Sequence, residues 1–310
     1  MGKRFARAAR PPARVCEVAM NTSEVQSSAS DVQQWVLGAP AMSTVDRSVP
    51  DGVSAPDLAQ YCLMLGDDAL VLSHRLSEWG VRAPELEEAA ALGAIALDLL
   101  GEARILLHRA GEVEGVGRGE DSLAYFRTAA EFRNVRLVEI DCGPGQDGGF
   151  SATVARLLLY TAWRVAVFER LMRSRDAVLA TFAARSLAGL TRHRDHAAQW
   201  VIRLGDANAA SARRMTGGFQ RVWPMTGELF TPHPVEARLA DAGCGVDPAV
   251  VRGEVSEVLD EVFSVARLER PDPTEFGGFV RPGGRDGEHT GGMEFLLADM
   301  QYLARSAAQL

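Results

Sequence analysis

The sequence predicts an all-α protein whose centre is a bundle of four long helices. Four long segments of the 310-residue chain carry apolar residues at helical spacing, whereas strand-like alternation is scarce throughout. A loop rich in Gly, Pro and Asp at 141–149 separates these segments into two pairs. Two long helical hairpins joined by an irregular crossover are typical of a ferritin-like bundle, here with additional helices packed around it.

The first pair of helices is predicted from capping signals and apolar stripes. Pro56 and Asp57 open the first helix, which runs to about Trp79. Pro84 stands at the start of the second helix, acidic residues fill its first turn, and basic residues lie near its end, as the helix dipole prefers. We expect the second helix to contain about 28 residues, or roughly 40 Å at 1.5 Å per residue.

The second pair is predicted at 151–175 and 177–204. Because the two helices are nearly contiguous, they should form an antiparallel hairpin with a tight turn near Ser174–Asp176. The remaining expected elements are short helical pieces within 120–140, helices at about 210–222, 234–242 and 247–268, a loop rich in Gly and Pro at 271–292, and a closing helix from Met293.

The N-terminal segment lacks this periodicity. Residues 1–56 are predicted to be a disordered tail, rich in Ser, Asp, Gly, Pro and Val from residue 21 on. We interpret residues 1–41 as a tail or as an artefact of the assigned gene start. Residues 57–310 are expected to form a single ferritin-like domain with a C-terminal helical extension.

Composition argues against several classes of function. The formal net charge is −8, and no basic stripe occurs outside the first few residues, so a nucleic-acid-binding role is not expected. No apolar run reaches the roughly 18–20 residues of a membrane span, and no apolar signal region follows the basic start. The four cysteines are far apart and fit no disulfide or zinc pattern, which favours a cytoplasmic protein.

His193 and His196, in LTRHRDHAAQW (190–200), have a spacing that can direct two imidazoles to one metal ion. A ferritin-like di-metal centre needs one carboxylate from each of two helices and a Glu-x-x-His from each of the other two. No Glu-x-x-His occurs in the four predicted helices. Leu190 and Gly189 occupy the positions three and four before His193, where the glutamate would have to stand.

Few carboxylates remain as metal ligands. Asp67 and Asp68 are the mid-helix acids of the first helix, and Asp98 and Glu102 are the nearest inward candidates in the second. A buried carboxylate needs a compensating partner, which one of the many arginines could supply. We favour a vestigial site rebuilt as an ion-pair network, with the two histidines on a hydrogen-bonded helix face. Metal binding by these residues is the alternative.

No Gly-x-Ser-x-Gly elbow or P-loop is present. The glycine-rich segment GGFVRPGGRDGEHTGG (277–292) follows no predicted strand, so a dinucleotide-binding fold is not supported. Contact with a partner is one interpretation of this segment, and a surface connector into the last helix is the other. The candidate contact residues are Gly283, Gly284, Arg285, Gly287, His289 and Thr290.

Six motifs are long and unusual: YCLMLGDDALVLSHRLSEW (61–79), APELEEAAALGAIALDLLGEARILL (83–107), AYFRTAAEFRNVRLVE (124–139), HAAQWVIRLGD (196–206), WPMTGELF (223–230) and GGRDGEHT (283–290). In these motifs the chain resembles the C-subunit family of bacterial phenylacetyl-CoA epoxidases. With the sequence between the motifs, the resemblance extends from about Asp57 to the C-terminus. It implies a ferritin-like fold, in agreement with the helix pattern.

The resemblance further implies a role in aerobic phenylacetate degradation. In such a complex a homologous A subunit holds a di-iron centre and epoxidises the ring of phenylacetyl-CoA with O₂, with electrons from a separate reductase. The C subunit resembles a paralogue without iron ligands, which would bind no cofactor, serve as structural partner and meet phenylacetyl-CoA only through the complex. Thr161 and Gly189 stand where the family tends to have an aspartate and a glutamate, which removes two further carboxylates.

Two other functions stay open at this stage. One is an oxygen-activating enzyme that holds iron or manganese in an irregular di-metal site of its own. Its ligands would be Asp68, Asp98, Glu102, His193 and His196. The other is a helical adaptor unrelated to this pathway.

Overall fold

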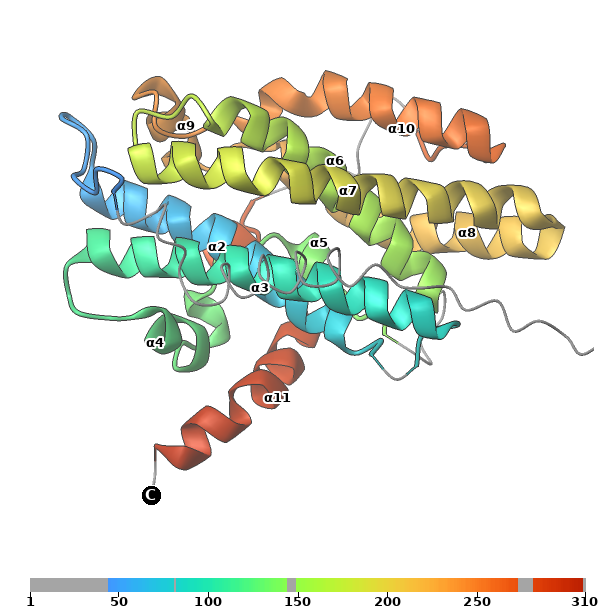
Figure 1. Cartoon of the computed structure of the whole chain (residues 1–310), viewed down its shortest axis with the longest axis horizontal. Helices are drawn as coiled ribbons and strands as arrows, with labels where there is room; N and C mark the ends of the chain where they lie inside the picture. Colours follow the sequence, from blue (N-terminus) through green and yellow to red (C-terminus); the bar gives the residue numbers. More distant parts are fainter. Residues whose placement is uncertain (1–43, 81, 144–148, 273–280, 309–310) are drawn as a thin grey trace, which may run out of the picture.

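The core of the fold is a pair of long helical hairpins. The structure, a computed structural model, describes residues 44–80, 82–143, 149–272 and 281–308. Helix α2 (Ala55–Ser77) pairs with α3 (Leu86–Glu114), and α6 (Gly149–Leu171) pairs with α7 (Ala177–Ala207). Figure 1 shows the two hairpins crossing in one bundle, and no strand occurs in the described residues. The predicted all-α class and the four long helices of a ferritin-like bundle are confirmed.

Helix α6 is the most enclosed of the four. Every residue from Ser151 to Phe168 is buried, as expected for a helix that is apolar on all sides. Two arginines, Arg156 and Arg164, interrupt this run, and both are fully buried. A buried cation is unstable without hydrogen-bond acceptors, so the bundle must supply them internally.

The α6–α7 hairpin turns where the sequence predicts. Asp176 caps α7, since its carboxylate accepts a hydrogen bond from the Leu179 backbone N–H at 2.8 Å. The same carboxylate forms a fully buried ion pair with Arg109 of α3. One side chain therefore both starts α7 and ties the second hairpin to the first.

Shorter elements surround the bundle. They are α4 (Glu120–Tyr125), α5 (Arg136–Glu139), α8 (Ala209–Val222), α9 (Pro234–Asp241), α10 (Arg252–Ala266), α11 (Gly291–Ala307) and the 3-10 turns η2 (Ala129–Glu131), η3 (Trp223–Phe230), η4 (Pro248–Val251) and η5 (Gly284–Asp286). In Figure 1, α10 covers α6 and α7 at one side of the bundle, and α11 leaves from the opposite side. The helices predicted at 210–222, 234–242 and from Met293 are confirmed to within a few residues, and the one predicted at 247–268 is split into η4 and α10.

The described part of the expected tail lies along α3. Arg109 donates a hydrogen bond to the Arg47 carbonyl at 2.7 Å, and the Arg47 guanidinium pairs with Glu112 at 2.7 Å. Residues 1–43 lie outside the described residues, so disorder in that segment stays a prediction. None of the helices in the described ranges has the length and apolar character that a membrane span requires.

Candidate functional site

Asp67 of α2 is bound by an arginine from the crossover segment. The Arg127 guanidinium donates from both terminal nitrogens to the two oxygens of the Asp67 carboxylate, and the Arg133 backbone N–H adds a third bond at 2.8 Å. Asp67 is 0% exposed and Arg127 3% exposed. A bidentate pair with a further backbone donor satisfies most of the carboxylate's acceptor capacity.

Asp68, the next residue along α2, is bound by an arginine from the far end of the chain. Arg285 donates to its two oxygens at 3.1 and 2.8 Å, and the Val135 backbone N–H donates at 2.8 Å. Burial raises the pKa of Asp68, while the Arg285 guanidinium acts in the opposite direction. The adjacent acids thus turn to different arginines and do not act as a pair of ligands.

Glu102 of α3 meets Arg164 of α6 in the interior of the bundle. The guanidinium donates to Glu102 Oε2 from Nε at 3.0 Å and from Nη2 at 2.8 Å, and Nη2 also donates to the Leu65 carbonyl of α2 at 3.3 Å. Burial raises the pKa of Glu102, and Arg164 lowers it. One arginine therefore bridges three of the four long helices.

Thr161, one turn before Arg164, is 0% exposed. Its hydroxyl donates to the Leu157 carbonyl of its own helix at 2.6 Å. The hydroxyl's hydrogen-bonding capacity is thus met within its own helix, and a threonine offers no negative charge to a metal ion.

The two histidines of α7 turn to different carboxylates. His193 Nε2 lies 3.0 Å from Asp98 Oδ2, and His196 Nε2 lies 3.0 Å from Glu88 Oε1. Trp200 donates to the other oxygen of Glu88 at 2.6 Å. Asp98 and Glu88 are ten positions apart on α3, so the imidazoles do not converge on one point.

These residues do not fit a di-metal centre. Asp67, Asp68 and Glu102 are each neutralised by an arginine, and a metal ion would have to displace that cation. Among the described residues, no three side chains of His, Cys, Asp or Glu lie where they could hold a metal ion together. The acids form a network of buried ion pairs that joins the helices.

The segment 283–290 directs Arg285 and His289 inward. Arg285 reaches Asp68, and His289 Nδ1 lies 2.8 Å from Glu139 Oε2. A Cβ on Gly284 would lie 2.0 Å from the Asn134 carbonyl oxygen, so only glycine fits there. Gly287 has a φ of +88° beside the Ala130 carbonyl. Gly283 opens η5 and Thr290 precedes α11. Contact of the outer side with a partner stays a prediction.

Sequence reasoning did not identify Arg127 or Arg164 as partners of the acids, nor Glu88 as the partner of His196. For Arg164 a signal existed, because a charged residue in a helix that is apolar on all sides must be buried with an acceptor. Glu88 carried no such signal. It is 108 residues from His196, and the contact depends on how the two hairpins cross.

Comparison with known proteins covers most of the chain. The sequence profile of the family described as phenylacetic acid catabolic protein matches residues 42–310. Over 248 residues the chain is 39% identical to an Escherichia coli (strain K12) protein that is named as the C subunit of 1,2-phenylacetyl-CoA epoxidase. That alignment covers 80% of this chain and 96% of the E. coli protein.

Proposed function

The chain belongs to the phenylacetic acid catabolic protein family, and we propose that it is a non-catalytic, structural subunit of a multicomponent phenylacetyl-CoA epoxidase. In this proposal it pairs with a homologous A subunit that holds the di-iron centre, receives electrons from a separate reductase and epoxidises the aromatic ring. The chain meets phenylacetyl-CoA only through the complex, in the cytoplasm.

One observation carries the proposal. The acids buried among the central helices are bound by arginines, as Glu102 is by Arg164 and Asp68 by Arg285. A guanidinium supplies the positive charge that a metal ion would otherwise supply to a buried carboxylate. The interior therefore supports a rigid scaffold, and the redox chemistry needs another subunit.

These ion pairs make the bundle rigid, which gives a partner protein a fixed surface to pack against. Arg164 joins α2, α3 and α6, and Arg285 anchors the segment before α11 to α2. Removing one member of such a buried pair strongly destabilises the folded protein. The pairs therefore hold the helices in one arrangement. A scaffold protein needs a fixed surface on which a second protein can pack with close complementarity.

Two measurements test the proposal. Iron and manganese are measured in the isolated, purified chain, and the chain is co-expressed with the A subunit, with a tag on only one of the two. We expect substoichiometric metal in the isolated chain and a stable complex with the A subunit. A soluble chain that never co-purifies with the A subunit would contradict a structural role.

One observation favours a second candidate, a metal-dependent oxidoreductase in its own right. Within the part of the chain that the structure describes, the buried Nδ1 of His193 has no hydrogen-bond partner. A free, buried imidazole nitrogen is a potential metal ligand. Stoichiometric iron or manganese that is lost in the His193→Ala and His196→Ala variants would establish this function, whereas metal content independent of these changes would exclude it.

A further inference from the structure

Helix α11 has an apolar stripe that the described residues leave exposed to solvent. Its inner side buries Met293, Leu296 and Leu297. On the outer side Phe295 is 78% exposed, Tyr302 68% and Leu303 78%. Phe295 and Tyr302 are seven residues apart, which places them on one side of the helix, whereas Leu303 follows the buried Leu296 by seven residues and lies at the edge of the buried side. A helix with apolar residues on two sides can pack against its own bundle on one side and against a second protein on the other.

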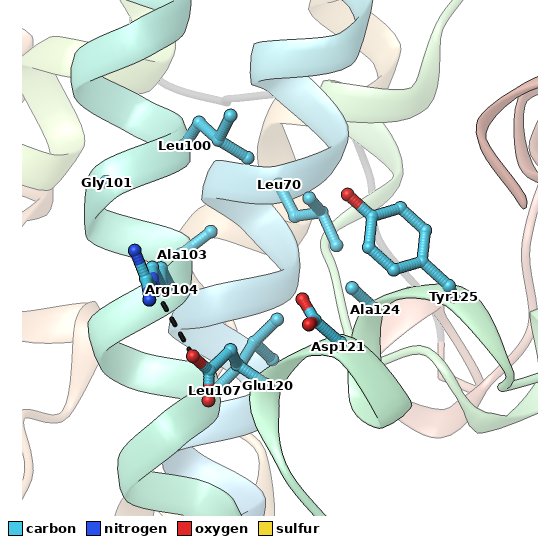
Figure 2. Close-up of a pocket in the computed structure, with 10 residues that line it drawn as sticks. All are labelled: Leu70, Leu100, Gly101, Ala103, Arg104, Leu107, Glu120, Asp121, Ala124 and Tyr125. Atoms are coloured by element: carbon cyan, nitrogen blue, oxygen red, sulfur yellow. Dashed lines mark hydrogen bonds and ion pairs between the residues drawn. The ribbon is translucent and has the colours of Figure 1, made fainter. Parts of the chain in front are cut away.

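A groove lies beside this helix on the same side of the bundle. It has a volume of about 210 Å³ and runs between α3 and α4. In Figure 2, Leu70, Leu100 and Ala124 line the groove, and the ion pair of Arg104 with Glu120 stands at its edge. The lining is mainly apolar with charges at the rim, which is the usual anatomy of a protein interface.

The groove adjoins α11 at one residue. Tyr125 lines the groove, and its backbone carbonyl accepts a hydrogen bond from Arg305 of α11 at 3.1 Å. A second hollow, of about 360 Å³, lies between η2 and α11 and includes Tyr302. Six of the eleven exposed large apolar side chains in the described residues belong to α3, to α11 or to the residue that follows α4: Leu97, Leu100, Phe126, Phe295, Tyr302 and Leu303. We call the surface that these residues share with the groove the α3–α4–α11 face.

The size of this face suits a stable protein partner. A single large aromatic side chain contributes on the order of 150–250 Å² when it is buried. Six large apolar side chains that are between 41% and 78% exposed therefore supply several hundred Å². That approaches the roughly 800 Å² per partner of a standard interface. Scattered single apolar residues would not make such a surface.

The charges of the face argue against a membrane surface or nucleic acid as its occupant. Helix α11 carries Glu294 and Asp299 and ends with Arg305, whose guanidinium is engaged by backbone carbonyls of the chain. An interfacial membrane helix would carry several basic residues on its polar side. Nucleic acid would require a basic surface, which a chain of net charge −8 does not offer here. A stripe at helical spacing beside an apolar groove fits a partner that presents helices.

We propose that the α3–α4–α11 face is where this chain binds the homologous A subunit. The inference rests on the proposed function and names the surface through which the chain would bind the A subunit. Phe295 and Leu303 project from α11 to contact helices of the A subunit, while the groove beside Leu100 receives apolar side chains from it. The rim charges around Arg104 and Glu120 fix the register of the two proteins.

The test compares single substitutions on opposite sides of the molecule. The A subunit is titrated with full-length wild-type chain and with the Phe295→Ser, Leu303→Ser and Leu100→Ser variants. Val265→Ser is the matched control, because Val265 is 54% exposed on α10, at the other side of the bundle (Figure 1). We expect each of the first three changes to raise the Kd at least about tenfold, as central interface positions do, and the control to leave it within about twofold.

The outcomes separate the two proposals. Failure of the wild-type chain to bind the A subunit would contradict the proposed function itself. Wild-type chain that binds while Phe295→Ser and Leu303→Ser leave the Kd unchanged contradicts only the assignment of the face. A chain that dimerises alone through these residues, shown by its mass in solution, with A-subunit binding intact, would assign the face to a second copy. Circular dichroism of each variant verifies that the helices are retained.

Discussion

Arg164 donates two hydrogen bonds to a single oxygen of Glu102, at 3.0 and 2.8 Å, in the interior of the helical bundle. Both side chains are nearly inaccessible to solvent, with exposures of 0% and 5%. A pair in such a position gains Coulomb energy but loses the hydration of both charges. Its contribution to the free energy of unfolding therefore depends on both partners being present.

The first prediction follows from this dependence. Glu102→Leu leaves the Arg164 guanidinium buried without its counter-charge, so we expect the free energy of unfolding to fall by about 3–5 kcal/mol. The double variant Glu102→Leu, Arg164→Leu removes both charges and should recover most of that loss. Urea unfolding of the isolated chain measures both values.

The exposed pair of Arg238 with Asp57 provides the control. Arg238 is 57% exposed in its side chain, and Arg238→Ala should change stability by no more than about 1 kcal/mol. If Glu102→Leu were as mild as this surface change, or if the double variant were the least stable of all, the ion-pair interpretation of the core would be wrong.

The second prediction concerns the histidines of α7. Because His193 pairs with Asp98 and His196 with Glu88, a double-mutant cycle should show coupling within each pair. Alanine substitutions should give coupling energies of roughly 0.5–2 kcal/mol within the matched pairs and close to zero for the crossed pair of His193 with Glu88. Thermal unfolding with and without a chelator provides the readout. Strong coupling of the crossed pair that disappears with chelator would indicate a shared metal ion.

The third prediction concerns glycines of the segment before α11. Gly284→Ala should destabilise the fold by roughly 2 kcal/mol or more, because the added Cβ would lie 2.0 Å from the backbone oxygen of Asn134. Gly287→Ala should destabilise the fold similarly. Gly287 has a φ of +88°, which side chains disfavour, and an added Cβ would lie 2.4 Å from the Ala130 backbone oxygen.

Gly253→Ala on α10 is the matched control, because a Cβ there meets no atom within 4 Å. An alanine in a helix is favoured over glycine by up to about 1 kcal/mol, so this variant should be neutral or slightly more stable. Equal melting temperatures for the three variants would show that the segment before α11 is not packed as the structure describes.

The sequence predicted the helices well because helix formation is local. Apolar spacing and caps such as Asp176 at the start of α7 lie within a few residues of the boundary they set. The absence of a Glu-x-x-His motif from the four long helices is also a local property, since it can be read from each helix alone. Both could therefore be argued without knowing how the hairpins cross.

The partners of the acids depend on that crossing. Asp68 is bound by Arg285, 217 residues away, and no short pattern connects them. The interpretation that the acids form ion pairs is confirmed for Asp67, Asp68 and Glu102. For Asp98 the expectation of an arginine was wrong, because the residue that faces it from α7 is His193. The cost of burying a charge requires that a buried acid have a partner. Only the packing of the helices decides which residue that partner is.

The last prediction is a pH dependence at Glu236. Burial raises the pKa of this carboxyl from 4.5 to about 7, while Arg285 opposes the shift. The folded chain therefore keeps the proton between about pH 4.5 and 7, whereas the unfolded chain releases it near pH 4.5. The contribution of Glu236 to the free energy of unfolding is thus fully present below pH 4.5 and is lost as the pH rises through 7.

Glu236→Gln cannot ionise and should escape this loss. Its stability relative to wild type should increase between pH 5 and 8, by up to on the order of 3 kcal/mol at 1.36 kcal/mol per pKa unit. His233, whose pKa burial lowers to about 4, acts with the opposite sign but is present in both proteins, so it cancels in the comparison. Glu131→Gln is the control of opposite sign, because hydrogen bonds from Thr128 lower the pKa of Glu131 and stabilise its charged form. Urea unfolding at each pH measures the difference, and a difference for Glu236→Gln that stays constant from pH 5 to 8 would show that the Glu236 carboxyl is not held in its neutral form by the fold.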